Sequence, residues 1–390
     1  MNGKRRLKMK QLTRLFIPIC LETLFYMLSG MVDTLMLSAV GDYAVGAVGT
    51  ANSYIGIFII MFSIISSGMV SVMTQNIGAG RPGVAYQARQ LGLLFNAVAG
   101  VLMAVFLFSG AGAILRMVGI ADALYEPALI YLKIVGGGCI LNAVIPIFSS
   151  YLRAFGYTKQ PLYATIVGNI ANFVMNAVFL FVLHKGVAGV ATATVISKIL
   201  NLCIVLYFSH KLISAKNSTE RIANKTVLGQ IVKVGLPSAC ETALYNVAMM
   251  LVIRFLNQMD AEGLNVTARS YTATISNFSY CVGAALAQAN AIMTGWHIGA
   301  GELEECDRGT KRAAFVGVCV AVCMETAIVL GSGFIMPLFT DNPEMTALVR
   351  KLLAIDIVLE IGRVTNLVFG QALKTSGDAV FPAVIAAVFM

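Results

Sequence analysis

Long uninterrupted runs of apolar residues constrain this chain more than any other feature of its sequence. The runs are roughly 20 to 28 residues long, enough for a helix to cross the ~30 Å hydrocarbon core of a bilayer. They do not alternate in polarity as the strands of a membrane barrel do. Only 12% of the residues are charged and 58% are hydrophobic, whereas a soluble domain carries about twice that charge. Because backbone inside lipid must satisfy its own hydrogen bonds, the sequence predicts an all-α polytopic membrane protein.

We expect ten complete membrane spans followed by the start of an eleventh. This stub begins near Ala379 and stops at Met390. The expected spans are residues 12–40, 46–76, 90–115, 127–152, 161–183, 187–210, 228–257, 269–296, 313–338 and 346–372.

Basic residues set the orientation, because cytoplasmic loops are enriched in Lys and Arg. With the N-terminus inside, nineteen of the 28 basic residues fall in cytoplasmic segments and five fall in outside loops. This asymmetry predicts a multi-pass protein of the plasma membrane, the inner membrane of a bacterium, with a cytoplasmic N-terminus. It also explains the net charge of +9 as basic residues facing anionic lipid, without a nucleic-acid partner.

The second half of the chain repeats three motifs of the first half in the same order. Pro-x3-Glu-Thr-x2-Tyr at 18–26 recurs at 237–245, a shift of 219 residues. Two further motifs recur with a shift of 221 residues: Ile-Gly-Ala-Gly at 77–80 and 298–301, and Leu-Arg/Lys-x2-Gly-x4-Pro at 152–161 and 373–382. Three motifs at nearly one offset indicate an internal duplication.

The shift covers six helices, an even number, so both halves start on the same side of the membrane and form a parallel repeat. We therefore predict two bundles around a central cavity: an N-lobe over 1–210, a cytoplasmic linker over 211–227 and a C-lobe over 228–390. A complete second bundle would need about forty more residues, so we expect a truncated chain whose second bundle is incomplete.

Ionisable groups inside the spans are the candidate functional residues, because a charge at the bilayer centre costs roughly 2.5–3.5 kcal/mol. Glu22 and Asp33 are eleven residues apart on the first span, so they share a face about 16 Å apart along the axis. A lone carboxylate in a dry cavity can exchange a proton for a cation, which is the coupling that an antiporter needs. Asp33 and Glu241 have no basic residue one helical turn away that could pair with them. The other ionisable groups, for which structural pairing stays open, are Lys133, Lys198, Arg254, Glu325, Asp356, Glu360 and Arg363.

Helical spacing places several of these groups together. Asp356, Glu360 and Arg363 share a face of the tenth span, and Arg363 can serve as a structural partner of either acid. Asn172 and Asn176 lie in an asparagine stripe on the fifth span, which suits either interhelical hydrogen bonds or a bound cation. The candidate residues for the substrate cavity are Tyr26, Tyr245 and Gln288.

Six segments together resemble the multidrug and toxic compound extrusion (MATE) transporters. They are Val-Asp-Thr at 32–34, Gln-Asn-Ile-Gly-Ala-Gly-Arg at 75–81, Leu-Arg-Ala-Phe-Gly at 152–156, Gly-Val-Ala-Gly-Val-Ala-Thr-Ala-Thr at 186–194, Gly-Leu-Pro at 235–237 and Leu-Lys-Thr-Ser-Gly-Asp at 373–378. The resemblance implies twelve helices in two six-helix lobes that form a V. It also implies export of polyaromatic cations in exchange for H⁺ or Na⁺.

The resemblance further implies a cation site in each lobe. Asp33 matches the acid of the first helix, and Asn172, Asn176 and Thr194 match the remaining N-lobe positions, so Na⁺ could bind among these four. Asn176 departs from the family pattern, where an acid is often found. We group Glu22 with this site. The family also uses acids on its seventh and tenth helices, where this chain has Glu241, Asp356 and Glu360.

We therefore expect a secondary antiporter that exports organic cations by alternating access. We expect it to be a monomer in membrane lipid, not an enzyme, with no metal or other cofactor apart from the coupling ion. The alternative is a lipid-linked-saccharide flippase of the same wider superfamily. Such a flippase should carry several basic residues in its cavity to hold pyrophosphate, whereas the expected N-lobe cavity carries acids.

Overall fold

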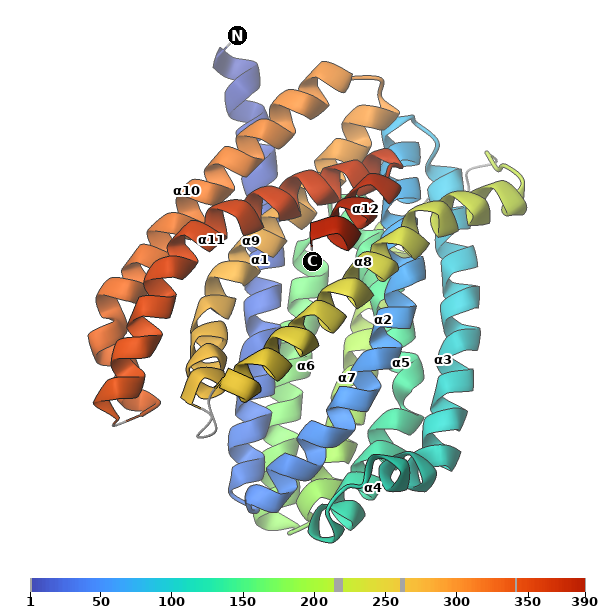
Figure 1. Ribbon diagram of the computed structural model, residues 1–390. Coiled ribbons are helices and arrows are strands. Elements are labelled where there is room, and N and C mark those ends of the chain that lie inside the picture. Colours follow the sequence, from blue (N-terminus) through green and yellow to red (C-terminus); the bar gives the residue numbers. More distant parts are fainter. Residues whose placement is uncertain (1, 214–219, 260–263, 341, 390) are drawn as a thin grey trace.

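The computed structural model describes residues 2–213, 220–259, 264–340 and 342–389, and all regular secondary structure within them is helical (Figure 1). This confirms the predicted all-α class. The helices are α1 (Asn2–Ser38), α2 (Asp42–Gly78), α3 (Pro82–Val118), α4 (Asp122–Gly137), α5 (Cys139–Ala154), α6 (Lys159–Ala177), η1 (Val178–Val182), α7 (Gly186–Leu212), α8 (Asn224–Met259), α9 (Leu264–Gly299), α10 (Leu303–Ile335), η3 (Met336–Leu338), α11 (Pro343–Ser376) and α12 (Val380–Phe389).

The predicted span over 127–152 consists of two helices instead of one. α4 and α5 are bent by 41° with respect to each other, and Gly138 is the residue between them. Three consecutive glycines at 136–138 leave this stretch without side chains that would favour a continuous helix. The bend therefore follows from a local sequence feature inside an otherwise apolar span.

Seven of the described helices are long and apolar enough to cross a membrane, and eight if α4 and α5 count as one span. The helices α9 and α11 occupy predicted spans but are not in this set, because both carry many polar residues. Among these are Ser276 and Asn290 on α9, and Asp356 and Glu360 on α11, which are all buried. Helices thus lie at all ten predicted positions, while apolarity alone does not establish ten spans.

The outer surface of the helices carries large apolar side chains that water would not tolerate in such density. On α3, for example, Leu102, Val105 and Phe108 are 60%, 61% and 57% exposed. A soluble monomer rarely exposes a continuous apolar patch of this kind. We infer that these side chains face lipid.

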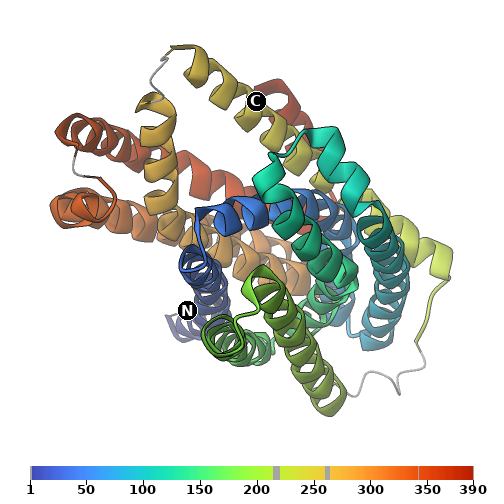
Figure 2. The same cartoon turned by 90° about the horizontal axis from the view of Figure 1, so that it is seen from below.

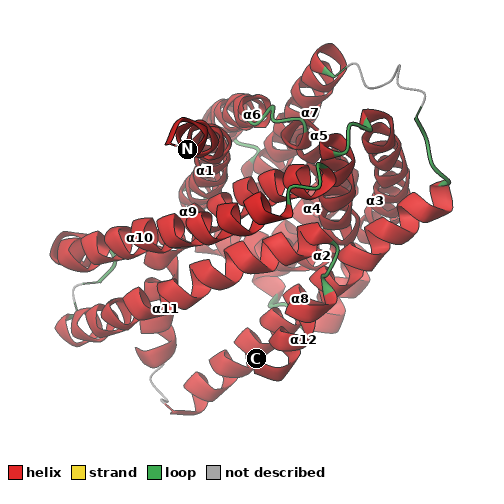
Figure 3. Cartoon of the chain, turned by 90° about the horizontal axis from the view of Figure 1, so that it is seen from above, coloured by secondary structure: helices red, strands yellow, loops and turns green. Residues whose placement is uncertain are grey.

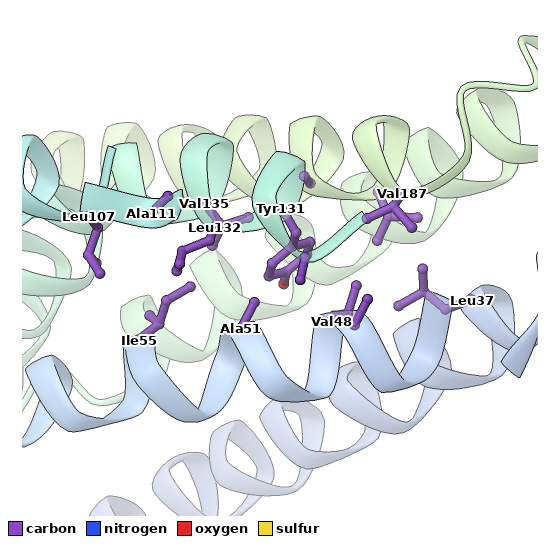
Figure 4. Packing of buried hydrophobic residues seen from close by; sticks show 14 of the residues in the cluster. Leu37, Val48, Ala51, Ile55, Leu107, Ala111, Tyr131, Leu132, Val135 and Val187 are labelled. Carbon is purple, nitrogen blue, oxygen red and sulfur yellow. The ribbon is translucent and has the colours of Figure 1, made fainter. Parts of the chain in front are cut away.

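The core of the first half lies where α4 packs against α2, α3 and α7. Figure 4 shows Tyr131 projecting from α4 toward α2, near Val48 and Ala51. Small residues on α2, such as Ala47 and Ala51, are fully buried and let the helices approach closely. This packing holds the Tyr131 hydroxyl in the interior of the first half.

We use N-lobe for helices α1 to α7 and C-lobe for α8 to α12, which pack together through α2 with α8, α2 with α9 and α1 with α9. Figures 1 and 3 show that the lower parts of α10 and α11 extend away from the N-lobe, while the opposite ends lie close to it. Figure 2 shows the same divergence from below. The helices are thus arranged as the predicted V.

The lobes meet through glycines that bring backbones into contact. A Cβ atom added at Gly68 on α2 would overlap with the carbonyl oxygen of Ile231 on α8, and one at Gly299 on α9 would overlap with that of Gln75 on α2. Gly78 lies in the same way against the backbone of Trp296. Gly78 and Gly299 are equivalent positions of the repeated Ile-Gly-Ala-Gly motif. We call this region the glycine interface.

The connection between the lobes is shorter than the predicted linker over 211–227. The helix α7 continues to Leu212 and α8 begins at Asn224, so both ends of that range are helical. Residues 214–219 lie outside the described part of the chain. At the other end, the predicted stub corresponds to α12, which packs mainly against α8.

Candidate functional site

Asp33 on α1 and two asparagines on α6 form a connected polar group in the N-lobe. The Nδ2 atom of Asn176 donates hydrogen bonds to Asp33 Oδ1 at 2.7 Å and to Asn172 Oδ1 at 3.1 Å. Asn172 and Asn176 are one turn apart on α6 and are 5% and 0% exposed. The Oδ1 atom of Asn176 is buried without a hydrogen-bond partner. The structure therefore brings three of the four predicted N-lobe residues into direct contact.

Thr194 on α7 joins this group through a residue that sequence reasoning missed. The hydroxyl of Tyr131 donates to Asn52 Oδ1 at 3.3 Å, and the same hydroxyl lies near Thr194 and within electrostatic reach of Asp33. Tyr131 lies inside an apolar span, where one aromatic residue among many gives no sign of a polar role. Only the packing of α4 against α2 shows where its hydroxyl lies.

Lys198 adds a positive charge to the same site. It lies one turn after Thr194 on α7, its Nζ donates to Asn142 Oδ1 at 2.8 Å, and its charge interacts with that of Asp33. A lysine in the middle of a span was visible in the sequence, and its four-residue spacing from Thr194 placed both on one helix face. The missing information was which other helices faced them.

Glu22 does not belong to the Asp33 group. Its Oε1 atom lies 2.6 Å from an Nη atom of Arg153 on α5. Arg153 also donates to Gln288 Oε1 on α9 at 3.1 Å, so this network connects the two lobes. The predicted cavity residue Gln288 thus takes part in an interlobe contact, and the predicted coupling residue Glu22 is part of an ion pair.

Glu241 forms the equivalent ion pair in the second half. Its Oε2 atom lies 2.8 Å from Lys374 Nζ on α11. Glu241 corresponds to Glu22 in the repeat, and Lys374 corresponds to Arg153. Within the described contacts, Glu241 is paired with Lys374 instead of joining the acids of α11. Two motifs found as a repeat in sequence therefore contact each other once in each lobe.

The acids of α11 form a second polar cluster together with an acid of α10. Arg363 lies 2.5 Å from Glu360 Oε1 and 3.2 Å from Asp356 Oδ1. Glu325 on α10 accepts a hydrogen bond from Ser276 at 2.9 Å. One oxygen each of Glu325, Asp356 and Glu360 lies within 4.8 Å of the other two. Spacing on one helix predicted the α11 group but not the contribution of Glu325.

This C-lobe cluster carries more negative than positive charge. Each of Glu325, Asp356 and Glu360 has one buried oxygen without a hydrogen-bond partner, and Arg363 is the one cationic side chain paired with them among the described residues. Several buried carboxylates require compensation by protons or by a cation. Clustered carboxylate oxygens are also the ligands that hard cations prefer, so the donor set fits Na⁺ as well as H⁺.

The two predicted cavity tyrosines are accessible. Tyr26 on α1 and Tyr245 on α8 are 69% and 48% exposed. Tyr26 lies in the electrostatic neighbourhood of Tyr131, and Tyr245 in that of Tyr280. Exposed aromatic rings near acidic groups can bind organic cations through cation–π contacts.

The fold and these two clusters define a helical membrane transporter. The MatE family model matches residues 18–178 and 237–390, and the chain therefore belongs to the MatE family of transporters. The two matched segments begin at the repeated prolines, Pro18 and Pro237. This agrees with the internal repeat found in the sequence.

Individual relatives agree with this assignment. The chain is 32% identical over 379 residues to an uncharacterized transporter, YisQ, of Bacillus subtilis (strain 168), covering 96% of this chain and 83% of the relative. A solved outward-facing multidrug resistance MATE family transporter of the MOP superfamily matches with a TM-score of 0.86 and 20% identity, covering 97% of this chain and 85% of that one. A MOP superfamily transporter from Pyrococcus furiosus matches with a TM-score of 0.81 and 19% identity, at the same coverage.

Proposed function

We propose that this chain is a secondary antiporter that exports organic cations in exchange for H⁺ or Na⁺. One observation carries the proposal: each lobe holds acidic side chains in the interior of its helices, around Asp33 in the N-lobe and around Glu360 in the C-lobe. Membrane proteins retain such costly groups where ions or substrates pass. Membership in a transporter family makes transport the role in which these acids are expected to act.

The balance of charge favours a cationic substrate over an anionic lipid-linked one. Among the described residues, the paired or clustered interior groups comprise six carboxyl groups and four cationic side chains, an excess of two acids. They are Glu22, Asp33, Glu241, Glu325, Asp356 and Glu360, and Arg153, Lys198, Arg363 and Lys374. A site for pyrophosphate would need the opposite excess. In the Pyrococcus furiosus transporter, the binding pocket has reverse polarity, which suggests a different function for that protein.

The arrangement of the lobes suits alternating access. The lobes pack at the glycine interface and diverge at the other end. If the N-terminus is cytoplasmic, as the basic residues predict, the glycine interface closes the cytoplasmic side and the helices diverge toward the outside. Rocking of one lobe against the other would then alternate the open side. Coupling follows where substrate and coupling ion compete for the same carboxylates.

Ethidium efflux from energised bacterial cells that express the full chain tests this function. We expect active efflux from the wild type, and a loss of at least tenfold for Asp33→Asn at unchanged expression. Glu304→Gln is the matched control, because Glu304 lies on the surface with its side chain 85% exposed. Efflux that survives Asp33→Asn would move coupling to the C-lobe cluster. If the folded wild type transports no cation but moves a lipid-linked saccharide across vesicles, the flippase is correct.

A further inference from the structure

The N-lobe site contains its own cation. Lys198 is part-buried on α7, beside Thr194, and its ammonium group is held by Asn142 at 2.8 Å within electrostatic reach of Asp33. The described titratable groups that face this pair are Tyr26 on α1, Tyr131 on α4 and Cys139 on α5. Within this set, Asp33 is the one carboxylate and Lys198 the one ammonium group.

The oxygen atoms that the family resemblance offers to Na⁺ take part in hydrogen bonds within the protein, and Asp33 is the one anionic group among them. Asp33 Oδ1 and Asn172 Oδ1 both accept hydrogen bonds from Asn176, and Thr194 donates its hydroxyl proton to the carbonyl of Val190 at 2.9 Å. The buried oxygen without a partner is Asn176 Oδ1. A hard cation needs several oxygen ligands that approach together, and anionic ones above all.

We propose that Lys198 acts as the built-in counter-cation of Asp33 and excludes Na⁺ from the N-lobe site. The four residues that the family resemblance offers for Na⁺ thus do not fit it in this chain. The C-lobe cluster of Glu325, Asp356 and Glu360, whose carboxylate oxygens lie within 4.8 Å of one another, serves as the reference site for comparison. The proposal rests on the proposed function for its biological meaning, but it concerns ion binding and can be tested without transport.

The physical reason is charge balance. A carboxylate and an ammonium group together carry no net charge, so a Na⁺ ion bound between Asp33 and Lys198 would leave a net positive charge in the interior of the lobe. It would also face an ammonium group held nearby by Asn142. Removing the ammonium group leaves the carboxylate of Asp33 without a compensating charge. The Oδ1 atom of Asn176, in the same polar group, is buried and has no hydrogen-bond partner.

Equilibrium binding of radioactive ²²Na⁺ to the purified full chain in lipid nanodiscs tests the proposal. For wild type we expect Na⁺ binding that Asp33→Asn leaves unchanged and that Glu360→Gln lowers. For Lys198→Met we expect one additional bound Na⁺ per chain compared with the wild type, and we expect Asp33→Asn on the same background to remove this additional site. Lys198→Arg should behave like wild type, because it keeps the positive charge.

Two results would overturn the proposal. One is a wild-type Na⁺ site that disappears with Asp33→Asn, since the ammonium group would then not exclude the ion. The other is a Lys198→Met variant that elutes from gel filtration as the wild type does, and is therefore folded, but that binds no additional Na⁺. If Lys198→Met does not fold, Lys198→Gln replaces it, and the comparison of wild type with Asp33→Asn still decides. A chain with the expected Na⁺ pattern but no efflux would refute the proposed function alone.

Discussion

At the scale of single residues, the ion pairs Glu22–Arg153 and Glu241–Lys374 show how far sequence reasoning reaches. Neither acid has a basic residue one turn away on its own helix, so the sequence offered no partner for either of them. Their partners lie more than one hundred residues away in the chain, in another repeated motif. Helical spacing finds partners on one helix, but it has no information about which helices pack together.

Charge reversal tests whether the Glu22–Arg153 pair stabilises the fold. We expect Arg153→Glu to destabilise the protein by roughly 3–5 kcal/mol, since it leaves a largely buried Glu22 facing another acid. The double variant Glu22→Arg with Arg153→Glu should recover at least half of that loss. Thermal unfolding of the purified variants measures both effects. Equal loss in the single and double variants would show that the pair contributes nothing beyond packing.

A second residue-scale prediction concerns Glu325, which the sequence did not connect to the acids of α11. Its carboxyl oxygen lies within 4.8 Å of those of Asp356 and Glu360. We expect Glu325→Gln to weaken coupling-ion affinity about tenfold, which corresponds to roughly 1.4 kcal/mol. The dependence of efflux on the concentration of the coupling ion measures this change. An unchanged dependence would restrict the C-lobe site to the acids of α11.

At the scale of helices, boundaries followed from the sequence well, because apolar runs and turn residues mark them directly. The bend between α4 and α5 was missed, although the three glycines at 136–138 supply a local reason for it. The polarity of α9 and α11 was also visible in the sequence. Its meaning was not, because the buried partners of these helices come from other elements.

Glycine contacts between helices make a prediction at this scale. We expect Gly299→Val to push α9 away from α2, because a Cβ atom there would overlap with the backbone of Gln75. Trp296 is the only tryptophan of the chain, and its Nε1 donates to the carbonyl of Ala154 at 2.9 Å. Its fluorescence should therefore shift to longer wavelength as water reaches the separated interface.

Gly229→Ala is the matched control for this experiment. Gly229 lies on α8 with open space around the position of a Cβ atom, so alanine should be neutral or stabilise the helix by up to about 1 kcal/mol. It should leave the emission of Trp296 unchanged. If Gly299→Val also leaves the emission and the melting temperature unchanged, the close approach of α2 and α9 is not required for the packed state.

At the scale of the whole molecule, the internal repeat was the most productive feature of the sequence. It predicts two related groups of helices with the same orientation, and Figure 1 shows helices α10 and α11 diverging from the first half of the chain at one end. The equivalent glycines of the repeated motif meet at the glycine interface, where their lack of side chains permits backbone contact. The two polar clusters are not equivalent, however: the N-lobe cluster has a single acid, Asp33, within electrostatic reach of Lys198, and the C-lobe cluster has three acids near Arg363.

Transport by the purified chain in proteoliposomes tests the central claim most directly. The account predicts that ethidium moves against its own gradient when an opposing gradient of H⁺ or Na⁺ is imposed, and that it stops when an ionophore dissipates that gradient. Asp33→Asn and Glu360→Gln should each reduce the driven movement at least tenfold, while Glu304→Gln should not. Ethidium movement that does not depend on either ion gradient would contradict cation-coupled export. The same holds if the protein moves no ethidium but moves a lipid-linked saccharide across the bilayer.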